Sequence, residues 1–256
     1  MKIPADPNDK DAATLHALFP TMVYQINLRE HERLNAPFAA AAEQFQFESE
    51  TSRRSKHFAG EYHGKILLHQ QTELRPFFDL LAVHVGKYLL ALGMKPELFE
   101  MQCLKSWFVI CEPGNEDEDD AIIAHNHSGS QISWVYYVDV PDECPAIKFH
   151  AGRELPTAPF RSAFHYDWND DRKSAVQTFN WWNSDTWSVH PRQGDLIMFP
   201  GHQLHSVDAN RNTSSRISVA GDVSLVLRPE HMNLEFGRTA SKHWLTLPLT
   251  EPNDKS

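Results

Sequence analysis

Short apolar runs separated by turn residues fill the second half of the chain, and this pattern constrains the fold more than any other feature. The run "MQCLKSWFVICEPG" (101–114) is expected to form a strand that ends at a Pro-Gly turn. Further strands are expected at 131–140, 146–150, 175–180, 186–190, 195–199 and 215–227. Many short strands at regular spacing are typical of an antiparallel sandwich or barrel. The chain is therefore predicted to be mainly β.

The first half has a helical texture instead. The segment "TELRPFFDLLAVHVGKYLLALGM" (72–94) predicts a helix that ends at Gly93. Its apolar residues recur at helical spacing: Leu74, Phe77, Leu81, Val85, Tyr88 and Leu89. Residues 18–28 predict a first strand, and residues 30–45 predict another helix. The helices are thus expected to precede an antiparallel β-core.

Chain length and composition fit one domain. The 256 residues divide into an expected flexible tail (1–17), a strand with helical support (18–100), a β-core (101–227) and a C-terminal extension (228–256). The net charge of −10, without a basic cluster, argues against nucleic-acid or anionic-membrane partners. Three cysteines without a CxxC motif indicate a reducing compartment, and no apolar leader or membrane-spanning run is found. We therefore expect a cytoplasmic protein, and the C-terminal "HWLTLPL" could support a homodimer.

Two histidines stand one residue apart at the mouth of a predicted strand. In an extended segment, His125 and His127 would point to one face and Asn126 to the other. Two neighbouring imidazoles chelate a borderline divalent metal well. A polar turn that contains imidazoles remains the alternative for this motif alone.

A second block, at residues 190–210, strengthens the metal hypothesis. Its Gly-Asp turn and apolar run lead to His205, at the start of another strand, which could complete a set of three ligands. Eleven residues later, Arg216 and Ser218 alternate with apolar neighbours and should share a face. A guanidinium with a hydroxyl beside it is a suitable clamp for a carboxylate.

Three blocks in this order resemble the 2-oxoglutarate- and Fe(II)-dependent oxygenases, above all a group found in bacteria and phages. They are "LFPT" (18–21), "HNHSGSQISWVYYVDVP" (125–141) and "FPGHQLHSVDANRNTSSRIS" (199–218). The resemblance implies a double-stranded β-helix, or jelly roll, that holds Fe(II) through His125 and His205. It also implies that Arg216 binds the far carboxylate of 2-oxoglutarate, with Ser218 beside it. Tyr136 or Tyr137 could add a phenol contact to this co-substrate.

One position departs from the family pattern. Most such oxygenases carry His-x-Asp or His-x-Glu, whereas this chain has His127 at the second position. We expect His127 to be the third iron ligand, although another carboxylate could serve, or only two protein ligands could exist. Asp139 is less well placed because it lies further along the strand.

The resemblance implies a dioxygenase that uses O2, hydroxylates an unidentified substrate, and releases succinate and CO2. One alternative is a cupin-type three-histidine metalloenzyme that does not use 2-oxoglutarate, but the glutamate expected in cupins is Gln131 here. Another is a non-catalytic barrel that binds a metal or a small ligand. The segment 161–191 is expected to lie over the site, where Trp181, Trp182 and Trp187 could wall the substrate pocket or fill core.

Overall fold

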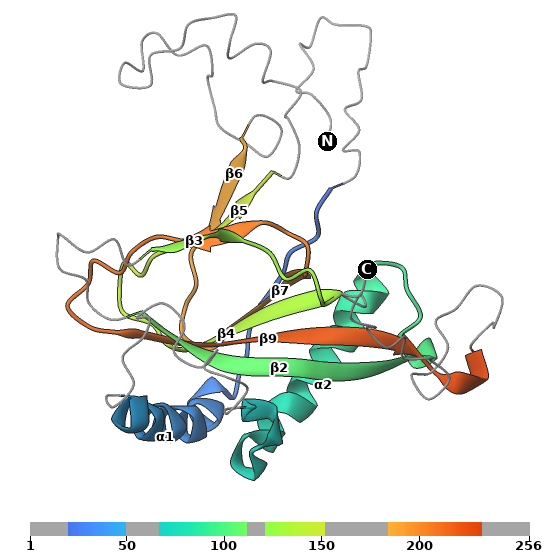
Figure 1. The fold of residues 1–256 in the computed structure, drawn as a ribbon, viewed down its shortest axis with the longest axis horizontal. Helices are drawn as coiled ribbons and strands as arrows, with labels where there is room; N and C mark the ends of the chain where they lie inside the picture. Colours follow the sequence, from blue (N-terminus) through green and yellow to red (C-terminus); the bar gives the residue numbers. More distant parts are fainter. Residues whose placement is uncertain (1–19, 50–66, 112–120, 152–183, 232–256) are drawn as a thin grey trace, which may run out of the picture.

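The structure is a computed structural model that describes residues 20–49, 67–111, 121–151 and 184–231. Within these ranges the chain is mainly β, as predicted. Two antiparallel sheets face each other, a five-stranded sheet in the order β1-β7-β4-β9-β2 and a four-stranded sheet in the order β3-β8-β5-β6. This arrangement is a double-stranded β-helix (Figure 1).

The strands of the larger sheet are β1 (Tyr24–Asn27), β2 (Phe99–Cys111), β4 (Ile132–Asp139), β7 (Asp195–Pro200) and β9 (Arg216–Leu227). Those of the smaller sheet are β3 (Ile122–His125), β5 (Ile147–His150), β6 (Thr186–Val189) and β8 (His205–Val207). The strands expected near 131–140, 146–150, 186–190, 195–199 and 215–227 are all present. The strand expected at 175–180 lies outside the described residues.

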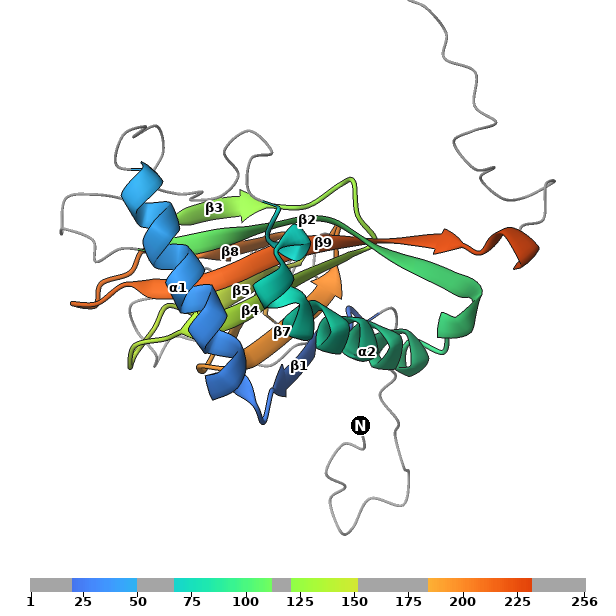
Figure 2. The same cartoon turned by 90° about the horizontal axis from the view of Figure 1, so that it is seen from below.

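Two helices, α1 (His31–Ser49) and α2 (Arg75–Ala91), cover the outer face of the five-stranded sheet (Figures 1 and 2). Short 3-10 turns at Leu68–Gln70 and Thr72–Leu74 lead into α2, and others occupy Pro96–Leu98 and Pro229–His231. The predicted apolar stripe of α2 is fully buried. Gly93 takes a φ of 75° just after the helix, which explains why the helix ends there.

The five-stranded sheet separates two hydrophobic cores. The helix-side core, which includes Phe38, Phe77 and Tyr136, fills the space between the sheet and the helices. The inter-sheet core, which includes Trp107 and Tyr137, fills the space between the two sheets. Burial of each such side chain contributes about 1.5–3 kcal/mol to stability. Successive strand residues alternate between these two cores, so strand register decides which residues can reach the inter-sheet space.

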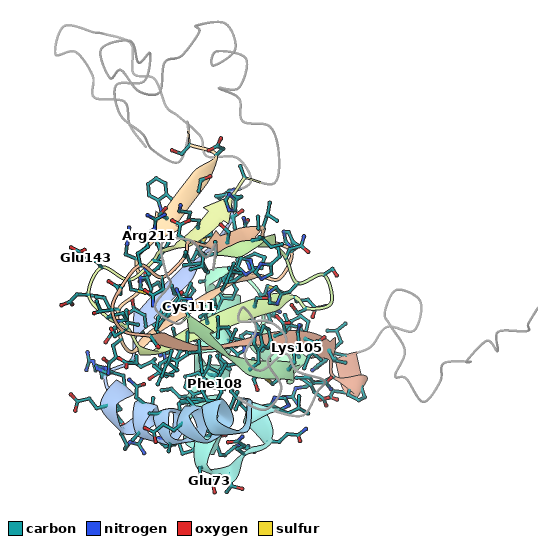
Figure 3. The ribbon with its side chains drawn as sticks, turned by 60° about the vertical axis from the view of Figure 1, so that its left-hand side comes forward. Glu73, Lys105, Phe108, Cys111, Glu143 and Arg211 are labelled. Atoms are coloured by element: carbon teal, nitrogen blue, oxygen red, sulfur yellow. The ribbon has the colours of Figure 1, made fainter. Side chains whose placement is uncertain are left out.

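Figure 3 shows this alternation on β2. Phe108 lies on the helix side, where its ring stands edge-on to Phe38 at a centroid distance of 6.4 Å. Cys111, three residues further along β2, reaches the inter-sheet side and packs against that core. Because 108 and 111 differ by an odd number of positions, they belong to opposite faces of the same strand.

The turn before β7 ties the first helix to the sheet. Gly194 has a φ of 82°, and a Cβ there would lie 2.5 Å from His31, so only glycine fits. Its carbonyl accepts a hydrogen bond from Leu28 N at 2.9 Å. Asp195, fully buried, accepts hydrogen bonds from Gln25 and Asn27 of β1. The Gly-Asp pair in the sequence is therefore a structural turn that fixes β1 against β7.

Several expectations fall on residues that the structure does not describe, among them Trp181, Trp182 and most of the acidic segment 115–121. Trp187 is described, on β6, and 47% of it is exposed. None of the helices within the described ranges is both long and apolar enough to cross a membrane.

Candidate metal and anion site

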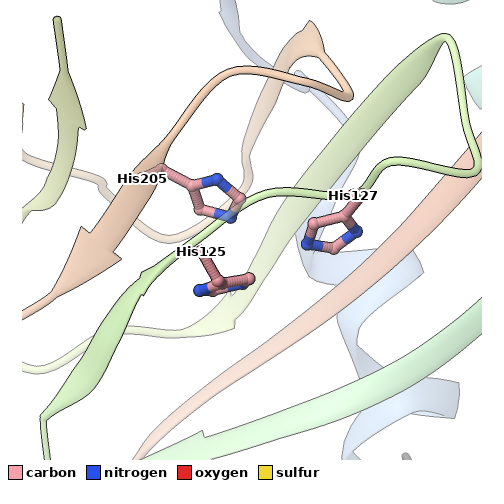
Figure 4. Close-up of side chains that lie close together, drawn as sticks. All are labelled: His125, His127 and His205. Carbon is pink, nitrogen blue, oxygen red and sulfur yellow. The ribbon is translucent and has the colours of Figure 1, made fainter. Parts of the chain in front are cut away.

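Three histidines meet at one mouth of the space between the sheets. His125 ends β3 and His205 begins β8, and the two residues are direct partners in the antiparallel pair. Their ring centroids lie 4.3 Å apart, and each lies 5.3 Å from the ring of His127. The possible ligand atoms of the three side chains all lie within 4.8 Å of one another (Figure 4). This spacing brings three imidazoles within reach of one metal ion.

The structure brings His127 beside His125, but not in the way that the sequence argument assumed. It assumed that His125 and His127 share one face of a strand, whereas β3 ends at His125 and His127 lies in the following loop. A backbone hydrogen bond from His127 N to Gly201 O, at 2.7 Å, holds this loop against the turn before β8. The loop, rather than strand alternation, brings the second histidine to the site.

Each of the three rings has its Nδ1 atom paired with an oxygen. His125 Nδ1 lies 2.8 Å from Ile123 O, and His205 Nδ1 lies 2.9 Å from Gln203 O. His127 Nδ1 lies 2.8 Å from Asp222 Oδ1. These oxygens can only accept, so each Nδ1 carries the proton and donates it. In the neutral form of each ring, Nε2 is then the atom with the lone pair, which is the atom that coordinates a metal.

Electrostatics also favour metal binding at His205. Burial, together with the nearby His125 and His127, lowers its pKa to about 4 against the opposing effect of the Gln203 carbonyl. His205 is therefore neutral at physiological pH, and it does not have to lose a proton before it binds a cation.

A buried carboxylate behind His127 was missed by the sequence analysis. Asp222, on β9, is 2% exposed and accepts hydrogen bonds from His127, from Ser133 Oγ at 2.7 Å and from Ser130 Oγ at 3.2 Å. Burial raises the pKa of Asp222, but the hydrogen bonds from His127 and Ser133 and the charge of Lys105 lower it overall. An acidic residue inside the apolar run of β9 was the available signal. Asp139, the carboxylate considered instead, is exposed at the end of β4.

A buried cation lies elsewhere along the same strand. Arg216 is 1% exposed and lines the inter-sheet cavity together with Ser218, as their alternation predicted. Its Nη2 donates to Cys111 Sγ at 2.9 Å and its Nη1 to Pro145 O at 3.4 Å, while its Nε has no hydrogen-bond partner. In the part of the chain that the structure describes, no carboxylate pairs with this guanidinium. A buried charge without a counter-ion is costly, so an anionic ligand would stabilise it.

One of the predicted co-substrate contacts needs correction. Tyr136 was expected to contact the ligand, but it points into the helix-side core, where its hydroxyl donates to Asn35 Oδ1 at 2.5 Å. Tyr137 lines the cavity instead, because neighbours on a strand face opposite sides. Ser218 is in the cavity wall, but its Oγ donates to Val109 O at 3.1 Å rather than pointing free.

One cavity connects these groups. The cavity is lined by His125, His127, His205 and Arg216. Most of the remaining wall is apolar: Trp107, Val109, Ile122, Trp134, Val135, Ile147, Phe199, Val207 and Ala220. Apolar walls exclude water and strengthen the electrostatic interactions of the few polar groups inside. Other histidines are accounted for structurally, since His84 bonds Tyr24, His150 bonds Ser206 and His202 is exposed.

Comparison with known proteins agrees with this geometry. Residues 105–222 match a family model described as "Putative 2OG-Fe(II) oxygenase". The chain is similar to a solved structure of the non-heme monooxygenase ThoJ in complex with Ni, with 11% identity, coverage of 80% of this chain and 74% of that one, and a TM-score of 0.51. No curated protein sequence matches the chain.

Two further solved structures are also similar. For the α-ketoglutarate-dependent carbocyclase SnoK of nogalamycin biosynthesis, the identity is 16%, the coverage 82% of this chain and 83% of that one, and the TM-score 0.48. For AviO1 of Streptomyces viridochromogenes Tue57, the identity is 12%, the coverage 80% of this chain and 90% of that one, and the TM-score 0.49. At 11% identity, the likeness to ThoJ concerns the fold alone.

Proposed function

We propose that this chain is a 2OG-Fe(II) oxygenase, an oxidoreductase that uses Fe(II), 2-oxoglutarate and O2, and that it hydroxylates a substrate C–H bond with release of succinate and CO2. The observation that carries the proposal is the cavity between the sheets. It joins three imidazoles, each with its Nδ1 within hydrogen-bond distance of an oxygen, to a buried guanidinium that has no carboxylate partner among the described residues.

The donor set fits iron. His125, His127 and His205 would hold the metal through Nε2, and imidazole nitrogen is a suitable ligand for Fe(II). Three protein ligands on one side of an octahedral ion leave three positions for exogenous ligands. When bound, Fe(II) and 2-oxoglutarate supply the oxidative chemistry, in which O2 is reduced, the co-substrate loses CO2, and one oxygen atom enters the substrate.

Arg216 would orient the co-substrate. Its fork can donate two parallel hydrogen bonds to the far carboxylate of 2-oxoglutarate, and its buried position makes that interaction strong. Tyr137 and Ser218 line the same part of the cavity and would limit how the chain of the co-substrate lies. Trp107 and Phe199 would keep bulk water from the reacting groups.

The cupin-type alternative receives less support from the geometry. Gln131, at the position where cupins carry a glutamate ligand, is exposed, and its Oε1 accepts a hydrogen bond from Leu225 N at 3.0 Å. In that alternative the buried Arg216 would also have no role, since no anionic co-substrate would bind beside it.

An anaerobic titration tests the proposal. Apo-protein is titrated with Fe(II) and then with 2-oxoglutarate, while the visible charge-transfer absorption of the iron–keto-acid chelate is recorded. We expect the band in the wild type and its loss at the same co-substrate concentration in Arg216→Met. Arg211→Met provides the control, because Arg211 is exposed on the loop that leads to β9. Iron binding without the band in the wild type would refute the use of 2-oxoglutarate.

A further inference from the structure

Three neutral imidazoles would leave the charge of Fe(II) without a negative protein ligand. We propose, resting on the function given above, that Asp222 is a positioning residue of this metal centre, which fixes the His127 ring and supplies a negative charge one hydrogen bond behind the metal. The carboxylate that position 127 lacks is thus provided from β9 through His127.

The contacts of Asp222 make it rigid. His127 Nδ1 lies 2.8 Å from Asp222 Oδ1 and 3.0 Å from Oδ2, so the imidazole faces both oxygens. Ser133 on β4 and Ser130 in the preceding loop donate to Oδ1, and Lys105 Nζ on β2 lies 3.3 Å from Oδ2. Donors from three separate segments therefore hold the carboxylate in one orientation, and the strand register places Asp222 between Ser133 and Lys105.

The His127 ring is fixed on its other sides as well. Trp107 stacks on it with centroids 5.7 Å apart and an interplanar angle of 21°. The backbone of His127 donates to Gly201, where a Cβ would lie 2.5 Å from Ser130 O and 3.0 Å from His127 O. With its backbone, one ring face and Nδ1 all held, the ring has one orientation, which presents Nε2 toward His125 and His205 (Figure 4).

Asp222 acts through His127 rather than as a ligand itself. The residues whose ligand atoms gather within 4.8 Å are the three histidines, and Asp222 is not among them. A carboxylate that accepts from the distal nitrogen of a coordinating histidine orients the ring and makes it a stronger donor. Loss of such a partner lowers metal affinity by about 10- to 100-fold.

Cobalt(II) binding to the full chain tests the inference, because Co(II) affinity and absorption report on the metal centre without turnover. We expect Asp222→Asn to weaken Co(II) binding by about 10- to 100-fold and to shift its visible d–d bands. Asp139→Asn is the matched control, since the same substitution there removes an exposed carboxylate at the end of β4. Its Co(II) affinity should stay within about threefold of wild type. Equal affinity in Asp222→Asn and wild type would overturn the positioning role.

The outcomes can be told apart, and one further measurement covers a variant that does not fold. If the wild type binds no Co(II), the proposed function fails, whereas normal binding by both wild type and Asp222→Asn rejects the role of Asp222 alone. If Asp222→Asn does not fold, proton NMR of the Co(II)-loaded wild type decides. Three hyperfine-shifted, solvent-exchangeable imidazole N–H signals are expected, one from each Nδ1. Absence of the exchangeable signal assigned to the His127 Nδ1 proton would show that His127 donates no held proton to Asp222.

Discussion

Replacement of Arg216 by methionine should weaken the binding of 2-oxoglutarate strongly without a comparable loss in the free energy of unfolding. The guanidinium is 1% exposed and has no carboxylate partner among the described residues. Substitution of buried ionic groups by apolar ones of similar volume is neutral or stabilising by about 1–4 kcal/mol. The lost hydrogen bonds to Cys111 and Pro145 offset about 0.5–1.5 kcal/mol each. We therefore expect the metal-free variant to lie between about 2 kcal/mol less and about 3 kcal/mol more stable than the wild type.

The same substitution should strongly weaken 2-oxoglutarate binding. Removal of one partner of a buried, hydrogen-bonded charge pair costs about 2–5 kcal/mol, which corresponds to an increase of about 30- to 5,000-fold in Kd. Urea unfolding of the metal-free protein measures the first effect, and anaerobic titration of the iron-loaded protein measures the second. Arg211→Met, an exposed counterpart, should change neither. A loss of more than about 2 kcal/mol of stability, or an unchanged Kd, would refute the reasoning that Arg216 is held for an anion.

Three other outcomes are expected. His205→Ala should lower Co(II) affinity by more than about 100-fold, whereas His202→Ala, at an exposed neighbour, should leave it unchanged in calorimetric titration. The His205 pKa of about 4 lies below its unfolded value of 6.5, so the unfolded chain binds the extra proton more readily. The free energy of unfolding of the metal-free wild type should therefore fall by about 3 kcal/mol from this residue as pH drops from about 6.5 to about 4. Denaturant unfolding of His205→Asn should lack this part of the decline. Gly201→Ala should destabilise the protein by about 1–3 kcal/mol and weaken Co(II) binding, because the added Cβ would meet Ser130 O. Gly129→Ala is the control, since the space around Gly129 is open. Equal melting temperatures of the two variants would contradict the close packing at Gly201.

Periodicity was sufficient for the larger features of the fold. The helical spacing in α2 identified its buried stripe, and alternation in β9 placed Arg216 and Ser218 on the cavity side. The two shortest strands of the site, β3 and β8, were not recognised in full, because three or four residues do not establish a period. Their pairing comes from contacts between segments some 80 residues apart, as in the direct pairing of His125 with His205.

The orientation of Tyr136 and Tyr137 and the contact of Asp222 with His127 could not be predicted from the sequence. Alternation required one of Tyr136 and Tyr137 to face the helices, but the choice depended on register, which the buried Asn35 contact of Tyr136 helps to fix. Asp222 lies 95 positions from His127, and only the pairing of β4, β9 and β2 brings Ser133 and Lys105 beside it. A polar residue within an apolar strand was visible in the sequence, whereas its partner was not.

The strand β9 has a consequence for attempts to alter which keto acid the protein accepts. One face of this strand carries Arg216, Ser218 and Asp222. The distance between the Arg216 guanidinium, which would bind the anion, and Asp222, which holds His127, is therefore set by the geometry of the backbone. An arginine introduced elsewhere on β9 would face the cavity only at positions two residues apart, which are separated by about 6.6 Å. At a position one residue away, its side chain would point into the helix-side core. A single added methylene in the keto acid lengthens it by far less than one such step. A preference for a longer or shorter diacid should therefore be easier to engineer from a neighbouring strand, such as from Val109 of β2, than along β9 itself.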